Sequence, residues 1–142
     1  MADAAALQNV IAKIVKEKSF ALGLAWAPHG DTLTCAGTPF FGADPKVNGF
    51  KHKSEEFKLG KGKGLPGRVW ANKKAEFKDD VQTFTVEQYP RLAVAKESGL
   101  KGCYGFPVLK HGEVAYVVEF FSFSPVTEDA ALEKHIEEVL VC

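Results

Sequence analysis

The sequence predicts an α+β domain built on a central antiparallel sheet of five or six strands. Helical apolar patterns lie near both ends of the chain, and short apolar runs separated by glycine and proline turns lie between them. The last two of these runs are apolar on both alternation phases, so their sheet has to be covered on both faces. We therefore expect a single domain over residues 1–142, with terminal helices on one face and short helices and loops over the other.

The N-terminal part of the chain predicts a helix followed by a β-hairpin. Residues 4–18 carry apolar side chains at helical spacing, and Asp3 is the expected N-cap. These apolar residues are Leu7, Val10, Ile11, Ile14 and Val15. Residues 19–27 and 32–36 form the two expected strands, because the turn residues at 28–31 separate two apolar runs.

The middle of the chain predicts short elements and a long connection. Residues 37–54 indicate a connection containing one helical turn, and connections of this length are usually functional or mobile. A short strand is expected at 56–59 and another at 75–77. Between them, Pro66 suits an early position in a helix over residues 65–73, because proline presets φ and its missing N–H is not needed there.

The C-terminal part predicts a helix, the two central strands and a last helix. The first helix spans 89–98 and ends at Gly99. The strands span 101–109 and 113–123, and Thr127 is the expected cap of the last helix. The inner face of that helix is expected to consist of Leu132, Ile136, Val139 and Leu140.

Composition limits the function classes. The chain has 142 residues, 46% of them hydrophobic, with 18 basic and 18 acidic side chains. This balance does not indicate a nucleic-acid partner, because such proteins usually carry a basic excess. No apolar run has the length of a membrane span, and the N-terminus has no signal-peptide pattern. We expect a cytoplasmic protein, with the nucleus as the alternative.

Cysteine and histidine positions indicate neither a metal site nor a catalytic site. Cys35, Cys103 and Cys142 are odd in number and far apart, which argues against a disulfide framework or metal-ligand spacing. Buried cysteine acting as a small hydrophobic residue is the simpler interpretation. The four histidines are scattered, and spacing indicates no catalytic triad. We therefore predict no metal ligands and no catalytic residues.

Residues 62–67 match the pattern G-x-G-x-x-G. A dinucleotide site would need this pattern between a parallel strand and a long helix, whereas the strands here are expected to be antiparallel and the helix short. A tight turn leading into a helix is the better interpretation. A weaker alternative is an anion held at the helix start, with Lys61, Lys63 and Arg68 nearby.

The order of several motifs resembles the GAF domain, a small sensory fold with a GAF/PAS-like sheet and a ligand between that sheet and a layer of short helices. The motifs are Gly60–Trp70, Asp79–Val81, Gln88–Arg91, Gly99–Leu100, Gly105–Val108 and Val117–Ser122. Glu87–Pro90, with Val81 and Phe84, is similar to the GAF-like domain of plant NIN-like regulators, which receives nitrate. Glu119–Ser122 is more similar to GAF domains of bacterial sensor kinases. The resemblance implies a receiver of small molecules rather than an enzyme.

We expect the ligand-binding residues to be Arg91, Tyr89, Trp70, Asp80, Phe77 and Glu119. Arg91 offers a planar fork of donors suited to a carboxylate, phosphate or nitrate. The alternative is a surface arginine paired with Asp79, Asp80 or Glu87. Glu119 lies in an apolar strand, so it either anchors a ligand or pairs with a partner in the helix layer.

Three functions remain open at this point. The first is a sensory or regulatory domain, in which a small ligand of unknown identity orders a mobile cover at 38–54 and 78–90 and passes the change to a signalling partner. A homodimer through the terminal helices accompanies this expectation; the question of a cofactor is left unknown. The second is an interaction or dimerisation module whose pocket is filled by Phe41, Phe84 and Phe106. The third is a thiol enzyme of the methionine sulfoxide reductase type, which needs two of the three cysteines to meet.

Overall fold

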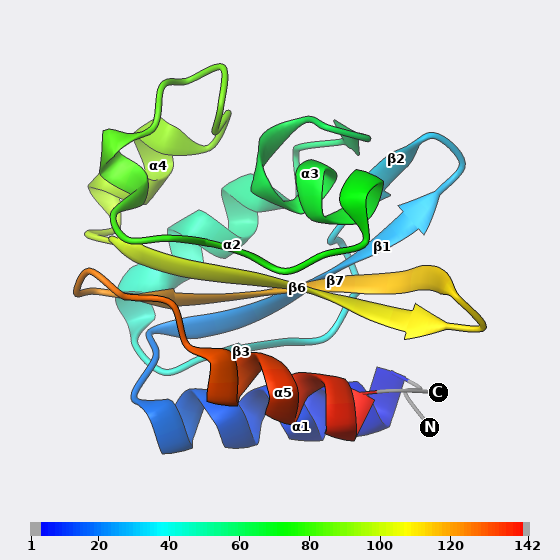
Figure 1. Ribbon diagram of the computed structural model, residues 1–142. Coiled ribbons are helices and arrows are strands. Elements are labelled where there is room, and N and C mark those ends of the chain that lie inside the picture. Colours follow the sequence, from blue (N-terminus) through cyan, green and yellow to red (C-terminus); the bar gives the residue numbers. More distant parts are fainter. Residues whose placement is uncertain (1–3, 141–142) are drawn as a thin grey trace.

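The N- and C-terminal helices pack on the same face of a central sheet, and three shorter helices cover the opposite face (Figure 1). The structure is a computed structural model, and it describes residues 4–140. The helices are α1 (Ala4–Lys18), α2 (Asn48–Ser54), α3 (Gly64–Asn72), α4 (Leu92–Glu97) and α5 (Ala130–Leu140). Two 3₁₀ turns are η1 (Pro45–Val47) and η2 (Val81–Thr83). The predicted α+β class and the two covering layers are confirmed.

Seven strands form one sheet within the described residues. They are β1 (Leu22–His29), β2 (Thr32–Thr34), β3 (Phe40–Gly42), β4 (Leu59–Gly60), β5 (Glu76–Lys78), β6 (Gly102–Lys110) and β7 (Glu113–Ser122). The order is β4-β2-β1-β7-β6-β5, with β3 also paired to β1, and all pairs are antiparallel. The strand count exceeds the predicted five or six because β3 lies inside the segment expected to be a connection.

The central strands β6 and β7 separate two apolar clusters. Towards α1 and α5, Phe106 and Phe120 pack among helix residues such as Ile11 and Ile136. Towards α2, α3 and α4, Val117 and Phe121 belong to the second cluster. The expectation that a strand apolar on both phases is covered on both faces therefore holds.

The glycine-rich turn before α3 lets the backbone of that helix pack closely against the turn after β4. A Cβ atom on Gly67 would lie 2.4 Å from the carbonyl oxygen of Gly60. The absence of that atom lets the first turn of α3 rest on the turn after β4, where Gly62 donates a hydrogen bond to the Gly67 carbonyl oxygen at 2.8 Å. The interpretation of G-x-G-x-x-G as a tight turn into a helix is confirmed.

The 37–54 segment is more regular than expected, because its polar residues build local caps. Asp44 accepts a hydrogen bond from the Lys46 amide at 2.9 Å and so starts η1. Gln8 of α1 bonds to the carbonyl oxygen of Phe40 at 2.6 Å and to its amide at 2.9 Å, and these bonds hold β3 against α1.

The starts of two helices differ from the sequence predictions. The 89–98 helix begins only at Leu92, so Tyr89 precedes it and Arg91 stands at its N-cap position. The last helix is capped by Asp129 rather than Thr127, since the Asp129 carboxylate accepts the Leu132 amide at 2.9 Å. The expected cap Asp3 lies outside the described residues.

The inner face of α5 is narrower than predicted. Leu132 and Ile136 are buried, as expected, whereas Val139 is 40% exposed. The side chain of Leu140 lies outside the described part of the structure. Among the described side chains of α5, the apolar stripe therefore reaches the sheet through Leu132 and Ile136.

Candidate functional site

An ion pair between Arg91 and Glu119 lies at the centre of the α2–α4 side of the core. The Nη2 atom of Arg91 is 2.7 Å from Oε2 of Glu119, and the two side chains are 1% and 0% exposed. The indole N–H of Trp26 donates to the other carboxylate oxygen of Glu119 at 2.7 Å. Arg91 also donates from Nη1 to the Ser54 hydroxyl at 3.3 Å. Both charges are thus compensated by hydrogen bonds inside the protein, as burial requires.

Aromatic rings surround the guanidinium of Arg91. Its central carbon lies 4.9 Å from the ring centroids of Trp26 and Tyr89, 5.2 Å from Phe50 and 5.9 Å from Phe121. Aromatic faces attract a cation, most strongly where water is excluded. Burial acts to lower the pKa of Arg91, but the charge of Glu119, its hydrogen bond and the neighbouring Tyr89 and Cys103 together raise this pKa above its ordinary value, so the arginine stays charged.

The Tyr89 hydroxyl is a buried polar group with an unused hydrogen-bonding capacity. Its side chain is 0% exposed, and its oxygen has no hydrogen-bond partner among the described residues. The ring is stacked on Phe84, with centroids 5.6 Å apart. Burial raises the pKa of Tyr89 well above its ordinary value, so the hydroxyl remains a neutral donor. A neutral buried donor without a partner next to a guanidinium is the most distinctive feature of this site.

Local hydrogen bonds place Tyr89 and Arg91 before α4. The Thr85 amide donates to the Gln88 side chain at 2.9 Å, and the Gln88 amide donates back to the Thr85 hydroxyl at 3.2 Å. The Tyr89 amide then bonds to the Thr85 carbonyl at 3.0 Å. This closed turn directs the segment from residue 85 to residue 91 onto the sheet and delivers both side chains to the core.

A cavity of about 450 Å³ opens between α2 and α4 and reaches Arg91. Its lining consists of Gly49, Lys53, Phe57, Pro90, Arg91, Ala93, Val94 and Glu97. Besides Arg91, the lining has one basic side chain, Lys53, and one acidic side chain, Glu97, among mainly apolar neighbours. Neither Glu119 nor Tyr89 lines this cavity, and the Arg91 side chain is 1% exposed, so access to the ion pair requires a movement of α2 or α4.

Two thiols lie in the same half of the core. Cys35 and Cys103 are both buried and free. Burial raises the pKa of Cys35 to about 12 and that of Cys103 well above its ordinary value. Because the thiolate is the reactive form, both side chains behave as small apolar residues at neutral pH.

The structure brings together three of the six predicted ligand residues: Arg91, Tyr89 and Glu119. Trp70 belongs to the same apolar cluster, on α3. Phe77 lies elsewhere, 40% exposed on β5 with its ring 6.3 Å from that of Tyr104 in the other cluster. Asp80 serves locally as the cap of η2, accepting the Gln82 amide at 2.9 Å.

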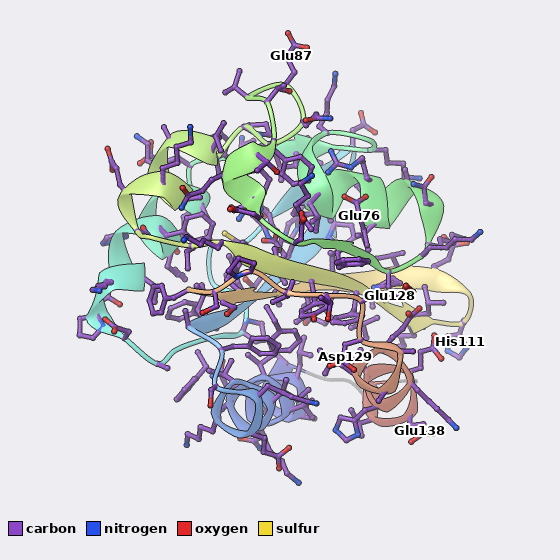
Figure 2. The ribbon with its side chains drawn as sticks, turned by 60° about the vertical axis from the view of Figure 1, so that its left-hand side comes forward. Glu76, Glu87, His111, Glu128, Asp129 and Glu138 are labelled. Atoms are coloured by element: carbon purple, nitrogen blue, oxygen red, sulfur yellow. The ribbon has the colours of Figure 1, made fainter. Side chains whose placement is uncertain are left out.

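The alternatives for the two charged residues are resolved by this geometry. Arg91 is not a surface arginine paired with Asp79, Asp80 or Glu87. Figure 2 shows Glu87 at the tip of its loop, pointing away from the protein. Glu119 has the partner in the helix layer that the sequence left open, and this partner is Arg91 itself.

Sequence reasoning missed Ser54, Phe50 and Phe121 around the guanidinium, and it did not join Trp26 to Glu119. A signal for Trp26 was present. Leu24 stands opposite Glu119 across the β1–β7 pair, and Trp26 is two residues along β1, on the same face. Diagonal neighbours on one face are within reach of a long side chain, so an indole N–H and a carboxylate placed in this way can bond. Ser54 and Phe50 lie on α2, whose position no local pattern fixed.

Arg68, considered as an anion contact, is engaged in structural bonds. Its Nη2 is 2.7 Å from a carboxylate oxygen of Glu76, and its Nε lies 3.0 Å from the other oxygen. Its Nη1 donates to the Gln88 carbonyl at 2.8 Å. Arg68 thus ties α3 to β5 and to the turn that precedes Tyr89.

The fold and this internal site define a GAF domain. A family model described as NLP protein GAF domain matches residues 2–141, and the chain belongs to this family. Similar curated relatives are Protein NLP7 and Protein NLP1 of Arabidopsis thaliana, with 26% and 27% identity. These alignments include 96% and 95% of this chain but 17% of each relative, so the chain spans about one sixth of their length.

Solved structures support the same fold at low sequence identity. Free methionine-R-sulfoxide reductase of Neisseria meningitidis has a TM-score of 0.72 and 17% identity, covering 96% of this chain and 72% of that one. An NreA protein of Staphylococcus aureus mutated in its nitrate binding site has a TM-score of 0.66 and 18% identity, covering 87% and 89%. The GAF domain of an Acinetobacter phosphoenolpyruvate-protein phosphotransferase gives 0.69 and 12%, covering 94% and 74%.

Two features are absent from residues 4–140. No helix there has both the length and the apolar character that crossing a membrane requires. No three or more histidine, cysteine, aspartate or glutamate side chains in that range gather into an arrangement able to hold a metal ion. His111, for example, stands at the β6–β7 turn, on the outside of the protein (Figure 2).

Proposed function

We propose that this chain is a regulatory GAF domain that receives a small molecule carrying a planar anionic group, of the nitrate or carboxylate class. The ligand enters between α2 and α4 and meets Arg91 and the Tyr89 hydroxyl. A matching change in α2 and in the 78–90 segment is passed to a partner protein. The chain acts without catalysing a reaction.

The unpartnered Tyr89 hydroxyl beside the Arg91 guanidinium carries this proposal. A buried donor without an acceptor costs about 1–3 kcal/mol, and a ligand oxygen would remove that cost. A guanidinium fork matches a planar anion, and Arg91 already holds one such group, the carboxylate of Glu119. An incoming anion would meet the same type of hydrogen-bond donor, the guanidinium N–H group, that now binds the Glu119 carboxylate.

Similarity to other proteins supports the proposal without specifying the ligand. The family is that of NLP protein GAF domains, and one structural neighbour is described by its nitrate binding site. We extend the anion class to this chain because of Arg91 and Tyr89, and we propose nitrate as the first ligand to test.

The test is thermal unfolding of the purified chain in sodium nitrate, sodium acetate and sodium chloride at equal ionic strength. A ligand at 100 times its dissociation constant stabilises a fold by about 2.7 kcal/mol, which is a readable shift in melting temperature. A nitrate or acetate shift absent in chloride supports the proposal. Equal curves in all three salts would contradict it for these two anions, and a wider set of 2-oxoacids, amino acids and cyclic nucleotides follows.

Matched variants locate the binding. Tyr89→Phe should weaken the ligand shift, because it deletes the one unpartnered donor. Tyr116→Phe is the control, since Tyr116 packs against the α1–α5 cluster on the other face of the sheet. If the ligand-induced shift in melting temperature falls equally in both variants, or in neither, the ligand does not bind at Tyr89.

The interaction module is the second candidate function. Of the three aromatic residues expected to fill a closed pocket, Phe84 stacks on Tyr89, whereas Phe41 and Phe106 lie on the opposite face. Of these three residues, only Phe84 lies on the side of the sheet where the pocket was expected, and this gives the interaction module less support than three filling side chains would. The homodimer through α1 and α5 and the cytoplasmic location stay predictions; light scattering of the eluting protein checks the dimer.

The thiol enzyme requires a thiolate, and burial of Cys35 and Cys103 opposes one. We expect that the protein, with its thiols reduced, does not reduce free methionine sulfoxide. Activity that disappears in Cys35→Ser or Cys103→Ser would overturn the non-catalytic assignment.

A further inference from the structure

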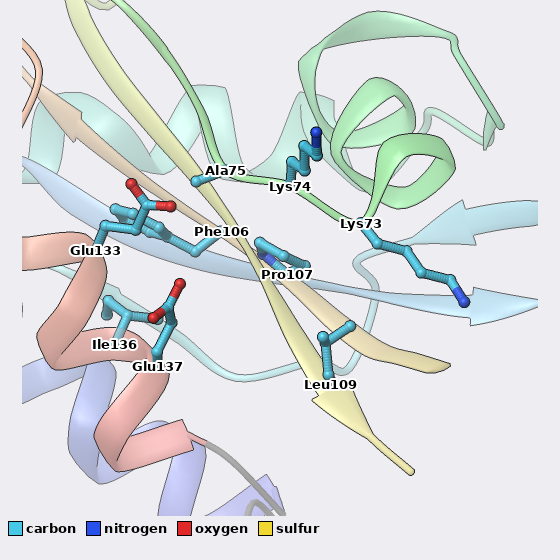
Figure 3. Close-up of a pocket in the computed structure, with 9 residues that line it drawn as sticks. All are labelled: Lys73, Lys74, Ala75, Phe106, Pro107, Leu109, Glu133, Ile136 and Glu137. Atoms are coloured by element: carbon cyan, nitrogen blue, oxygen red, sulfur yellow. The ribbon is translucent and has the colours of Figure 1, made fainter. Parts of the chain in front are cut away.

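A second cavity, of about 600 Å³, lies at a sheet edge away from the Arg91 site. Its lining residues are Lys73, Lys74, Ala75, Phe106, Pro107, Leu109, Glu133, Ile136 and Glu137. Figure 3 shows β6 running between two walls of this cavity, α5 on one side and the segment from Lys73 to Ala75 on the other. The cavity is therefore centred on a strand.

That strand is unpaired along the cavity. β5 pairs only with residues 103–105 of β6, through Lys78, Phe77 and Glu76. From Phe106 to Lys110, β6 pairs with β7 on one side, and no described strand pairs with it on the other. In a strand, successive residues direct their backbone N–H and C=O groups to alternate sides. Pro107 has no N–H to donate, and the register with β7 shifts between Val108 and Leu109. The other backbone groups of 106–110 that point away from β7 remain open to another strand.

The two walls carry opposite charges. Glu133 and Glu137 stand one turn apart on α5, whereas Lys73 and Lys74 lie on the other side of β6 with their side chains directed away from α5 (Figure 3). The Lys73 ammonium donates to the Gly112 carbonyl oxygen at 2.9 Å. A shallow hollow that continues along the same edge adds Glu128 to the acidic side. Among the described residues, no ion pair within 4.0 Å involves Lys74, Glu133 or Glu137, because the open strand separates the walls; Lys73 pairs with Glu113 at 3.3 Å.

A second copy of the chain does not fit this edge. If two copies paired through their β6 edges around a two-fold axis, the two strands would be antiparallel. The helix-covered face that carries α5 would then lie on the same side of the joined sheet in both copies. The α5 walls would then meet each other, and so would the lysine walls. Like charges placed together in this way oppose association.

We propose that the open edge of β6 binds an extended polypeptide segment of a partner protein, added to the sheet as a strand. Successive side chains of a strand point to opposite faces. The fitting segment therefore alternates, with basic side chains towards Glu133 and Glu137 and acidic side chains towards Lys73 and Lys74. Apolar contacts come from Phe106, Leu109 and Ile136. Strand addition of this kind draws affinity from main-chain bonds and specificity from alternate side chains.

The test uses two ten-residue peptides of equal composition, with blocked ends. The first repeats Lys-Glu-Val-Thr, which puts lysine on one face of the extended chain and glutamate on the other. The second rearranges the same residues so that both charges occur on both faces. Amide chemical shifts of the ¹⁵N-labelled protein report the site, and their concentration dependence gives the affinity.

We expect the segregated peptide to shift the amides of Phe106, Val108, Leu109 and Lys110 and to bind at least about fivefold more tightly than the mixed peptide. Glu133→Lys combined with Glu137→Lys should abolish most of that difference. Lys134→Glu is the control, since Lys134 is an exposed α5 residue outside the cavity lining. Melting curves confirm that each variant is folded.

Several outcomes would overturn the proposal. They are no shift at 106–110 at millimolar peptide, equal affinity for the two peptides, or an unchanged difference after the double charge reversal. A concentration-dependent dimer that protects the 106–110 amides without peptide would assign the edge to a second copy instead. Nitrate or acetate in the same titration leaves these amides unshifted if the edge and the Arg91 site are independent.

Discussion

The guanidinium of Arg91 and the carboxylate of Glu119 meet at 2.7 Å in the interior, with at most 1% of either side chain exposed. Breaking a buried pair by removing one partner leaves a lone charge in the core and typically costs about 3–5 kcal/mol. That is a large part of the roughly 5–15 kcal/mol by which domains are usually stable. The pair therefore constrains both the stability of the domain and the chemistry of its internal site.

The first prediction concerns single and double replacement of this pair. Arg91→Met and Glu119→Gln should each destabilise the domain by about 3–5 kcal/mol. The double variant should be more stable than either single variant, because no charge remains buried and the amide oxygen introduced by Glu119→Gln still offers an acceptor to Trp26. Urea unfolding gives the free energies. Strictly additive losses would show that the two side chains act independently.

The second prediction concerns rescue of Glu119→Gln by an anion. This variant keeps the shape of the side chain but leaves Arg91 without a counter-charge. A small planar anion that reaches Arg91 should raise the melting temperature of Glu119→Gln more than that of the unaltered chain. Chloride at the same ionic strength is the control. An equal response of both proteins would mean that anions do not reach the guanidinium.

The third prediction concerns Tyr89→Phe in the absence of ligand. The hydroxyl has no partner among the described residues, so deleting it should leave the free energy of unfolding unchanged or raise it by up to about 1 kcal/mol. Urea unfolding in a buffer free of nitrate and carboxylates measures this. A clear loss of stability would reveal a partner for the hydroxyl, such as an internal water.

Most of the fold follows from local patterns, whereas the site depends on contacts between distant residues. The α1 stripe, the β1–β2 hairpin and the two-sided β6 and β7 are all visible in short windows of sequence. Glu119 stood out because it interrupts an apolar strand. Ser54 did not, because its bond to Arg91 joins positions 37 residues apart. The small strand β3 was equally hidden, since its pairing with β1 and its bonds to Gln8 are long-range.

The fourth prediction concerns pH. Burial raises the pKa of the Cys35 thiol from 9.0 to about 12. A raised pKa in the folded state adds stability below pH 9, which is lost as the pH rises towards 12 because the unfolded thiol ionises first. Each such thiol contributes a slope of about 1.4 kcal/mol per pH unit in that window. In Cys35→Ala, the free energy of unfolding should therefore fall less steeply with pH above about pH 9 than in the unaltered chain. Between about pH 6 and 8, its dependence on pH should be the same in both proteins.

The fifth prediction concerns two glycines that differ in their surroundings. Gly67→Ala should destabilise the domain by about 1–3 kcal/mol, because its new Cβ would lie 2.4 Å from a backbone oxygen that has no room to yield. Gly49→Ala is the matched control. It lies in α2 with nothing within 4 Å of the new atom, and should stabilise by about 0.5–1 kcal/mol. Similar effects at both sites would refute the packing argument.

The two bonds from Gln8 to Phe40 have a mechanical consequence. They clamp the N-terminal helix to the strand from which the chain runs through η1 into α2, where Ser54 contacts Arg91. The backbone from α2 through η1 to β3, together with the two bonds from β3 to Gln8, therefore connects α2 with a helix on the far side of the sheet. We expect Gln8→Ala to uncouple the two layers, so that a spin-label distance between α1 and α2 broadens. An unchanged distance distribution would locate the coupling elsewhere.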